Sequence, residues 1–259
     1  MKNRKAKTAI VSSLMLGIVA LSGCDGGSSS AAAPVTPPAP APEPPPPVVA
    51  DATFEVTVSN LTLAQPMSPV AVVLHRAGFN SFIDGETSSL ALELLAEGGD
   101  NTDVLGEAVA ADEHLTSMSS EGPIAPSSIG SPIVLTVPED QLDDMRLTVI
   151  SMLVHTNDAF TGANGANVSS MAVGDTIRLT GHTWDAGTEN NDEQGASMPG
   201  PDFGGEGFNS NRDDIIDRVR FHQGAVTAAS VESGDANSDL AERHRFDNPT
   251  SRISITRTE

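Results

Sequence analysis

The feature that most constrains the fold is an alternation of apolar and polar residues with a period of two. It is clearest at residues 53–61, where Phe54, Val56 and Val58 alternate with polar side chains. A strand with one face in the core has this pattern, whereas a helix repeats every 3.6 residues. Similar β-rich runs follow, separated by Gly, Pro, Asn and Asp, at residues 70–75, 133–137, 146–155, 176–180, 218–222 and 252–257. These runs predict an all-β protein, an antiparallel β-sandwich.

One segment departs from this period. Residues 88–96 place Leu90, Leu94 and Leu95 at helical spacing, begin with serines that can cap a helix, and are followed by a glycine pair. A second short helix is expected at residues 103–111. We expect both helices as an insertion between strands, packed against one edge or end of the sandwich.

The first fifty residues differ in composition from the rest of the chain. Four cations, at positions 2, 4, 5 and 7, precede an apolar run from Ala9 to Leu21, as in the signal peptide of an exported protein. The run ends in Leu-Ser-Gly-Cys, which is typical of the cleavage site of a bacterial lipoprotein. We therefore expect residues 1–23 to be a signal peptide and Cys24 to be the lipidated residue.

Two other interpretations stay open: a membrane-anchored helix with a chance cysteine, and a secreted protein with an incidental one. Cys24 is the only cysteine, so no intramolecular disulfide can form, and lipidation gives the unpaired thiol a role. Residues 24–50 hold Gly, Ser and nine of the 18 prolines, which predicts a disordered, partly stiff tether. We expect one domain at residues 51–259, extracytoplasmic and lipid-anchored to the cell envelope, at the periplasmic face or the cell surface.

The charge of the chain argues against one class of partner. The formal net charge is -21, and after residue 23 ten arginines and no lysine face 35 acidic residues. A nucleic-acid partner is not expected, because phosphate binding requires a basic surface. Acidity on this scale is also common as an adaptation for solubility or salt, so by itself it identifies no site.

Sequence motifs for catalysis are absent. The chain has no Gly-x-Ser-x-Gly, no His-Glu-x-x-His and no phosphate-binding glycine loop. The histidines have no ligand spacing; they stand at positions 75, 114, 155, 182, 222 and 244. Without a cysteine in the domain, a zinc site would need histidines brought together by folding. His75, His155 and His222 stand at the ends of predicted strands, where packing or solvent contact is their expected role.

The segment from Asn157 to Asp202 holds two acidic clusters that bracket one predicted strand. Asp158 belongs to the first cluster, and the second runs from Asp185 to Glu193. Carboxylates at the same end of a sandwich repel one another unless a cation lies between them, and Ca²⁺ accepts oxygen ligands in adaptable geometry. Two solvated acidic loops without a metal are the alternative.

These motifs resemble those of a known domain family. Residues 151–162, Ser-Met-Leu-Val-His-Thr-Asn-Asp-Ala-Phe-Thr-Gly, followed by Asp-Ala-Gly-Thr-Glu at 185–189, resemble the N-terminal spondin domain of F-spondin and mindin. The ending Ser-Ile-Thr-Arg at 254–257 and the pair Asn60-Leu61 also fit. The likeness covers most of residues 52–259.

The resemblance implies an antiparallel β-sandwich, similar to calcium-dependent membrane-binding domains, that holds calcium in loops at one end. Carried over by position, the metal ligands fall on Asp158, Asp185 and Glu189. This chain departs from the family at Glu189, where the animal domains have Asp, and at Ala159, where they have an aromatic residue. The longer side chain of Glu189 changes the ligand geometry.

Three functions are compatible with these features. The resemblance favours a membrane-tethered calcium-binding adhesion or interaction module, not an enzyme, with an unknown protein or glycan ligand. A metal-assisted hydrolase acting on an envelope or extracellular polymer is the second, because Asp185, Glu189, Asp192 and Glu193 supply carboxylates for acid and base roles. The third is a structural envelope lipoprotein without metal.

Overall fold

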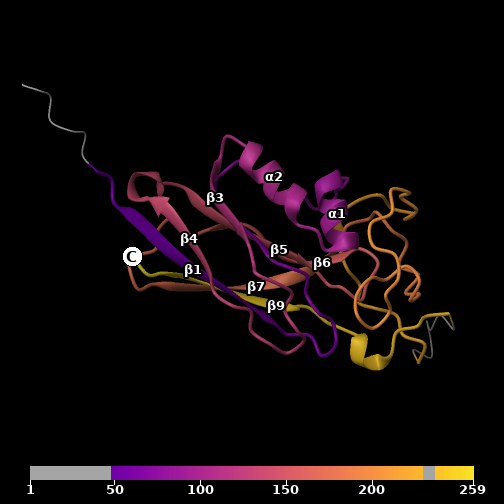
Figure 1. Cartoon of the computed structure of the whole chain (residues 1–259). Coiled ribbons are helices and arrows are strands. Elements are labelled where there is room, and N and C mark those ends of the chain that lie inside the picture. Colours follow the sequence, from indigo (N-terminus) through magenta and orange to yellow (C-terminus); the bar gives the residue numbers. More distant parts are fainter. Residues whose placement is uncertain (1–47, 230–236) are drawn as a thin grey trace, which may run out of the picture. The chain divides into compact units, whose positions relative to one another are not determined.

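The computed structural model describes residues 48–229 and 237–259, which form mostly antiparallel β-sheet (Figure 1). The expected signal peptide, Cys24 and nearly all of the expected tether lie outside these residues. The described residues form one compact unit. Within the described part, no helix is both long and apolar enough to cross a bilayer.

The described residues contain nine strands, two α-helices and two short 3-10 turns. In chain order they are β1 (Asp51–Asn60), β2 (Ala71–Arg76), α1 (Leu90–Gly98), α2 (Thr102–Ala110), β3 (His114–Ser119), β4 (Ile133–Pro138), η1 (Glu139–Gln141), β5 (Met145–Met152), β6 (Ala159–Asn167), β7 (Thr176–Asp185), β8 (Arg220–Phe221), η2 (Glu242–His244) and β9 (Ser251–Arg257). The predicted antiparallel β-sandwich with two short inserted helices is confirmed.

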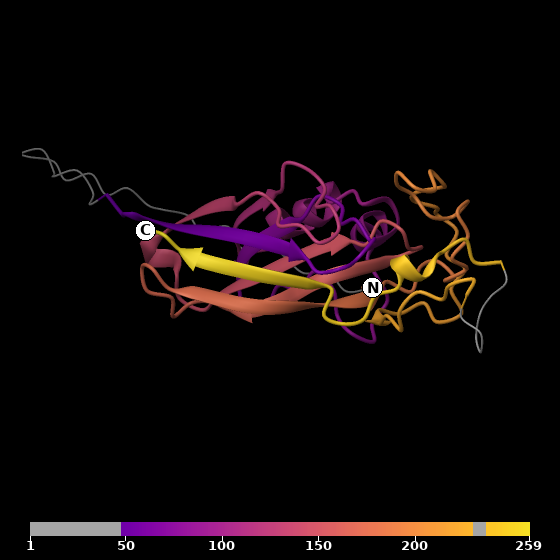
Figure 2. The same ribbon diagram turned by 90° about the horizontal axis from the view of Figure 1, so that it is seen from below.

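Strand β7 connects the two layers of the sandwich. The strand order is β3-β2-β5-β6-β7-β9-β1-β4, with β8 added to β7. Residues 176–181 of β7 pair with β9, and residues 182–185 pair with β6. Figure 2 shows β9 lying between β1 and β7. Gly181 lies where β7 changes partner, and a Cβ there would be 1.9 Å from the hydroxyl oxygen of Ser251.

The main core lies between these layers and follows the alternation seen in the sequence. Phe54, Val56 and Val58 of β1 are buried, and the residues between them are partly exposed. They pack in one apolar cluster with side chains from the other layer, including Leu74 of β2 and Leu147 of β5. The period of two therefore predicts correctly which face of β1 is inside.

Helix α1 begins and ends as its end signals predict, and the two helices cover one face of the sheet. The Ser89 hydroxyl accepts the N–H of Leu92 at 3.2 Å, and Gly99 ends α1 with φ 71°. In a second apolar cluster, Leu92 and Leu95 pack with Ile150 of β5 and with a β6 phenylalanine. Helix α1 therefore lies over β5 and β6, strands in the middle of the sheet, whereas α2 contacts the edge strand β3.

Strands β3 and β6 are absent from the sequence-based prediction. In β3 most side chains are only partly buried, so no clear alternation marks it. Strand β6 is rich in Ala and Gly, which have low strand propensity, yet it pairs with β5 and β7 on its two sides. At Gly162 an added Cβ would be 1.9 Å from the carbonyl oxygen of Val149, so β6 approaches β5 closely there.

Candidate metal centre

Asp158 and Asp185 lie side by side because β6 and β7 pair. Asp158 immediately precedes β6, Asp185 is the last residue of β7, and Ala159 is opposite Asp185 in the antiparallel register. Figure 1 shows the orange loops that follow β7 at this same end, near α1. The two acidic segments therefore meet at one end of the sandwich, as the sequence predicts.

The Asp-Ala-Gly-Thr motif forms a turn that holds both carboxylates. Gly187 N donates to Oδ1 of Asp185 at 2.8 Å, and Thr188 N donates to Oδ2 of Asp158 at 2.8 Å. Gly187 has φ 72°, and a Cβ there would be 2.4 Å from the backbone nitrogen and oxygen of Arg218. Glycine is therefore required by both the left-handed conformation and the close approach of the next loop.

A third carboxylate, from the loop between β7 and β8, completes the group. Asp158, Asp185 and Asp214 each offer an oxygen within 4.8 Å of the others. Arg220 Nη2 donates to Oδ2 of Asp185 at 2.8 Å and to Oδ2 of Asp214 at 2.6 Å. The side chains of Asp185 and Asp214 are only 3% and 6% exposed. This group is called the three-carboxylate cluster below.

Helix α1 positions the loop that carries Asp214. Arg212 in this loop forms a salt bridge of 2.6 Å with Glu93, which is buried in α1. The backbone N–H of Asn209 donates to Oε2 of Glu97 at 2.8 Å, one turn further along the helix. The helical insertion thus has a direct role in building the cluster, because it fixes the loop against the sheet.

Burial and mutual repulsion make the cluster electrostatically strained. Burial, followed by the charge of Asp185, raises the pKa of Asp158 to about 7, although the amides of Thr188 and Glu189 act in the opposite direction. Burial also raises the pKa of Asp185, against the effects of Asn191 and Arg220. Oδ1 of Asp158 is buried and has no hydrogen-bond partner. Such an atom is costly unless something binds it.

Glu189 borders the cluster and does not belong to the group of three. Its backbone N–H donates to Asp158 at 3.2 Å, and its side chain is buried with Oε2 unpartnered. Burial raises the pKa of Glu189 to about 8, and the charges of Glu97 and Asp158 add to the effect in that order. The structure therefore brings Asp158 and Asp185 together and adds Asp214 to them, and it leaves the Glu189 carboxylate outside this group of three.

The cluster can hold a metal ion. With three ionised carboxylates and one guanidinium, the metal-free cluster carries two net negative charges, which favours a cation there. The ligand atoms of the cluster are carboxylate oxygens, which hard cations such as Ca²⁺ and Mg²⁺ prefer. A polar pocket of about 230 Å³ lies beside the cluster, lined by Asp185, Arg220 and His222 among others. Of the three carboxylates, Asp185 lines this pocket.

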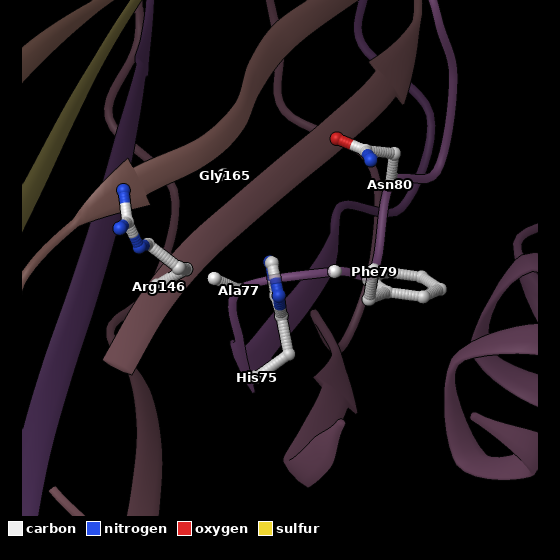
Figure 3. A pocket seen from close by; sticks show the side chains of 7 residues that line it. His75, Ala77, Phe79, Asn80, Arg146 and Gly165 are labelled. Carbon is white, nitrogen blue, oxygen red and sulfur yellow. The ribbon is translucent and has the colours of Figure 1, made fainter. Parts of the chain in front are cut away.

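Another pocket lies toward the other end of β6, and no carboxylate of the described residues lines it. Figure 3 shows the His75 ring in it, with Arg146 on one side and Phe79 on the other; the volume is about 200 Å³. Nδ1 of His75 is 2.7 Å from the carbonyl oxygen of Arg76, and Nε2 is 2.9 Å from the Thr148 hydroxyl. Both ring nitrogens have partners, and burial lowers the pKa of the ring. His75 therefore has a structural role.

Sequence reasoning missed Asp214 and Arg220. The only signal is the acidic run around Asp213 and Asp214, in a loop that matches no motif. No protein-family model and no curated protein matches this chain. What the cluster can do chemically therefore follows from its own geometry and charge.

Proposed function

We propose that the domain is a calcium-binding adhesion or interaction module, tethered outside the cytoplasm by lipid on Cys24. The observation that carries the proposal is the buried carboxylate of Asp158, which has a free Oδ1 beside Asp185 and Asp214. A divalent cation there would satisfy that oxygen and reduce the repulsion among the three carboxylates. Calcium is the proposed ion because it takes six to eight oxygen ligands in flexible geometry.

The resemblance to spondin domains supports the same ion. It places calcium ligands on Asp158 and Asp185, the two residues that the β6–β7 pairing brings together. We propose Asp214 as the third carboxylate ligand, and Glu189, whose backbone N–H donates to Asp158, as a further one after a side-chain movement. Backbone oxygens of the surrounding loops would supply further ligands.

Arg220 would couple ion binding to the position of the loop between β7 and β8. Its guanidinium now occupies the position of a counter-charge between Asp185 and Asp214. Calcium must compete with it for the same oxygens, so binding would release Arg220 toward the pocket. Ion binding would then change the loop between β7 and β8, and this loop is the proposed binding face for a protein or glycan.

The test is the thermal unfolding of the purified full chain in chelator and then in excess calcium. Calcium at about 100 times its Kd stabilises by about 2.7 kcal/mol, which corresponds to a Tm rise of roughly 5 to 10 °C for a domain of this size. Asp185→Asn should remove most of this rise. Asp84→Asn, which makes the same charge change at an exposed position, should keep it. A wild-type Tm that does not respond to calcium would refute the proposal.

The membrane tether is tested separately. Cells fed a tagged fatty acid should label the wild-type protein and not the Cys24→Ala variant. The labelled protein should fractionate with membranes, and the variant should not. Labelling that persists in the variant would place the anchor elsewhere.

A further inference from the structure

We propose that His155, His244 and Asp202 form a second metal site, for Zn²⁺ or a similar transition-metal ion. This site is distinct from the three-carboxylate cluster in its residues and in its ligand chemistry. The sequence gives no metal-ligand spacing for the histidines, since 155 and 244 are far apart in the chain. Folding brings them together.

The three residues come from three different segments. His155 lies three residues after β5, Asp202 is in the loop between β7 and β8, and His244 ends the 3-10 turn η2. One ligand atom of each lies within 4.8 Å of the other two, and Nε2 of His244 is 3.7 Å from Oδ2 of Asp202. In a tetrahedral zinc site the ligand atoms are about 3.4 Å apart, given bonds of about 2.0 to 2.2 Å. Only a small closure is needed.

Both imidazoles are buried and each has a free nitrogen. His155 is 2% exposed and His244 is 1% exposed, and Nε2 of each has no hydrogen-bond partner. Both ring nitrogens of His75 have partners. Nε2 of His222 is buried without one, but among the described residues His222 belongs to no group of three ligand side chains, whereas His155 and His244 do. Each of these two histidines also offers a ligand atom within 4.8 Å of an Asp202 oxygen and of the other imidazole, which is the arrangement that a shared ion requires.

His155 already has the arrangement of a metal ligand. Its Nδ1 is 3.2 Å from the carbonyl oxygen of Ala64. A carbonyl can only accept, so Nδ1 carries the proton and Nε2 keeps its lone pair. A hydrogen bond from the second ring nitrogen to a backbone carbonyl is the usual way in which proteins orient metal-binding histidines.

His244 must change its protonation to bind. Its Nδ1 accepts the N–H of Ala241 at 3.1 Å, which places the ring proton of the metal-free form on Nε2. Metal binding at Nε2 displaces this proton, and protonation of Nδ1 then ends the contact with Ala241. Binding should therefore alter the short turn η2 (Glu242–His244), which gives the site a local structural signature at the Ala241 amide.

Access and ligand type both fit a transition metal. The Asp202 side chain is 46% exposed and, with His155, lines an otherwise largely apolar pocket of about 460 Å³, from which water could supply a fourth ligand. Two imidazole nitrogens and one carboxylate suit zinc, copper or nickel, whereas calcium prefers oxygen alone. The two proposed sites should therefore select different ions.

The experiment is a titration of the metal-free full chain with ZnCl₂ by calorimetry, and with CoCl₂ by visible absorption. We expect one Zn²⁺ per chain and a cobalt spectrum typical of tetrahedral coordination. His155→Gln and Asp202→Asn should each weaken zinc binding at least about tenfold, because each replaces an imidazole or a carboxylate with a neutral amide, which is a weak ligand for zinc. His182→Gln removes an imidazole from an exposed position on β7 and should leave the affinity unchanged.

Two further variants separate this site from its surroundings. Arg243 lies 3.6 Å from Oδ2 of Asp202, and its side chain is 59% exposed. Arg243→Gln removes a competing cation, so it should tighten zinc binding severalfold. Asp185→Asn, in the three-carboxylate cluster, should leave zinc binding unchanged.

The inference is overturned if the protein binds no stoichiometric zinc, or if zinc binding survives the ligand substitutions. If the buried histidine variants fail to fold, Asp202→Asn decides, because its half-exposed side chain is not needed for packing. In the wild-type protein, the amide resonance of Ala241 should shift on zinc addition. An unshifted resonance would also count against ligation by His244.

Discussion

Replacing Asp158 by asparagine should stabilise the metal-free protein at pH 8 and abolish its response to calcium. Oδ2 of Asp158 accepts the N–H groups of Thr188 and Glu189, a role that an amide oxygen can keep. Oδ1 has no partner, and an NH₂ group in its place could donate to Asp185 or Asp214. The substitution therefore removes a buried charge and preserves the shape of the side chain.

The expected magnitude follows from the pKa of Asp158. That pKa is about 7 in the folded protein, and about 3.9 in an unfolded chain. A raised pKa favours folding below the unfolded value, and this contribution is lost as the pH rises through the folded value. Three pKa units correspond to about 4 kcal/mol at pH 8. Burying the new amide offsets part of this, so we expect a gain of about 2 to 4 kcal/mol.

The assay is urea unfolding in chelator at pH 8 and at pH 4, repeated with calcium at pH 8. The variant should exceed the wild type in unfolding free energy at pH 8, and the difference should largely vanish at pH 4. Asp84→Asn is the matched control and should change little. A variant less stable than the wild type at pH 8 would refute the reasoning, because Asp158 would then not be a strained buried charge.

Three further predictions concern the loops and the sheet. Arg220→Gln should lower the Tm in chelator, because it leaves two buried carboxylates without a counter-charge. It should also enlarge the rise in Tm that calcium causes, because Arg220 no longer competes with the ion. A smaller rise would contradict this competition. Burial, and then Arg220, lowers the pKa of His222 to about 4. An unfolded histidine has a pKa of about 6.5, so the stability that comes from the lowered pKa is lost as the pH falls below that value. Between pH 7.5 and pH 5, the unfolding free energy of the wild type in urea should therefore fall by about 2 kcal/mol more than that of His222→Gln. Equal losses would contradict this. Gly162→Ala should destabilise by more than about 3 kcal/mol, because its Cβ meets a backbone oxygen at 1.9 Å, whereas Gly106→Ala in open space on α2 should stabilise by about 0.5 to 1 kcal/mol in the same assay.

Much of the fold can be read from local patterns. The alternation around Phe54 and Val56 predicts a half-buried strand because the pleat of any strand has that period. The Ser89 cap and the glycine that follows α1 predict the helix ends, because capping involves only neighbouring residues. Strand β6 cannot be predicted in this way, because its Ala and Gly residues carry no strand signal. Its pairing with β5 and β7 holds it in the sheet.

The sites divide in the same way. Asp158 and Asp185 are marked in the sequence by their acidic motifs at the ends of β-rich segments. The glycine of the Asp-Ala-Gly-Thr motif forms the turn that holds Asp185. Asp214, and the meeting of His155 with His244, depend on loop packing between residues far apart in the chain. Sequence alone determined the β-architecture, the helix ends and the acidic character of one end, because these follow from nearest neighbours along the chain. Tertiary structure alone decided which carboxylates and which imidazoles converge, because that depends on strand partners and on the salt bridge that holds the long loop against α1.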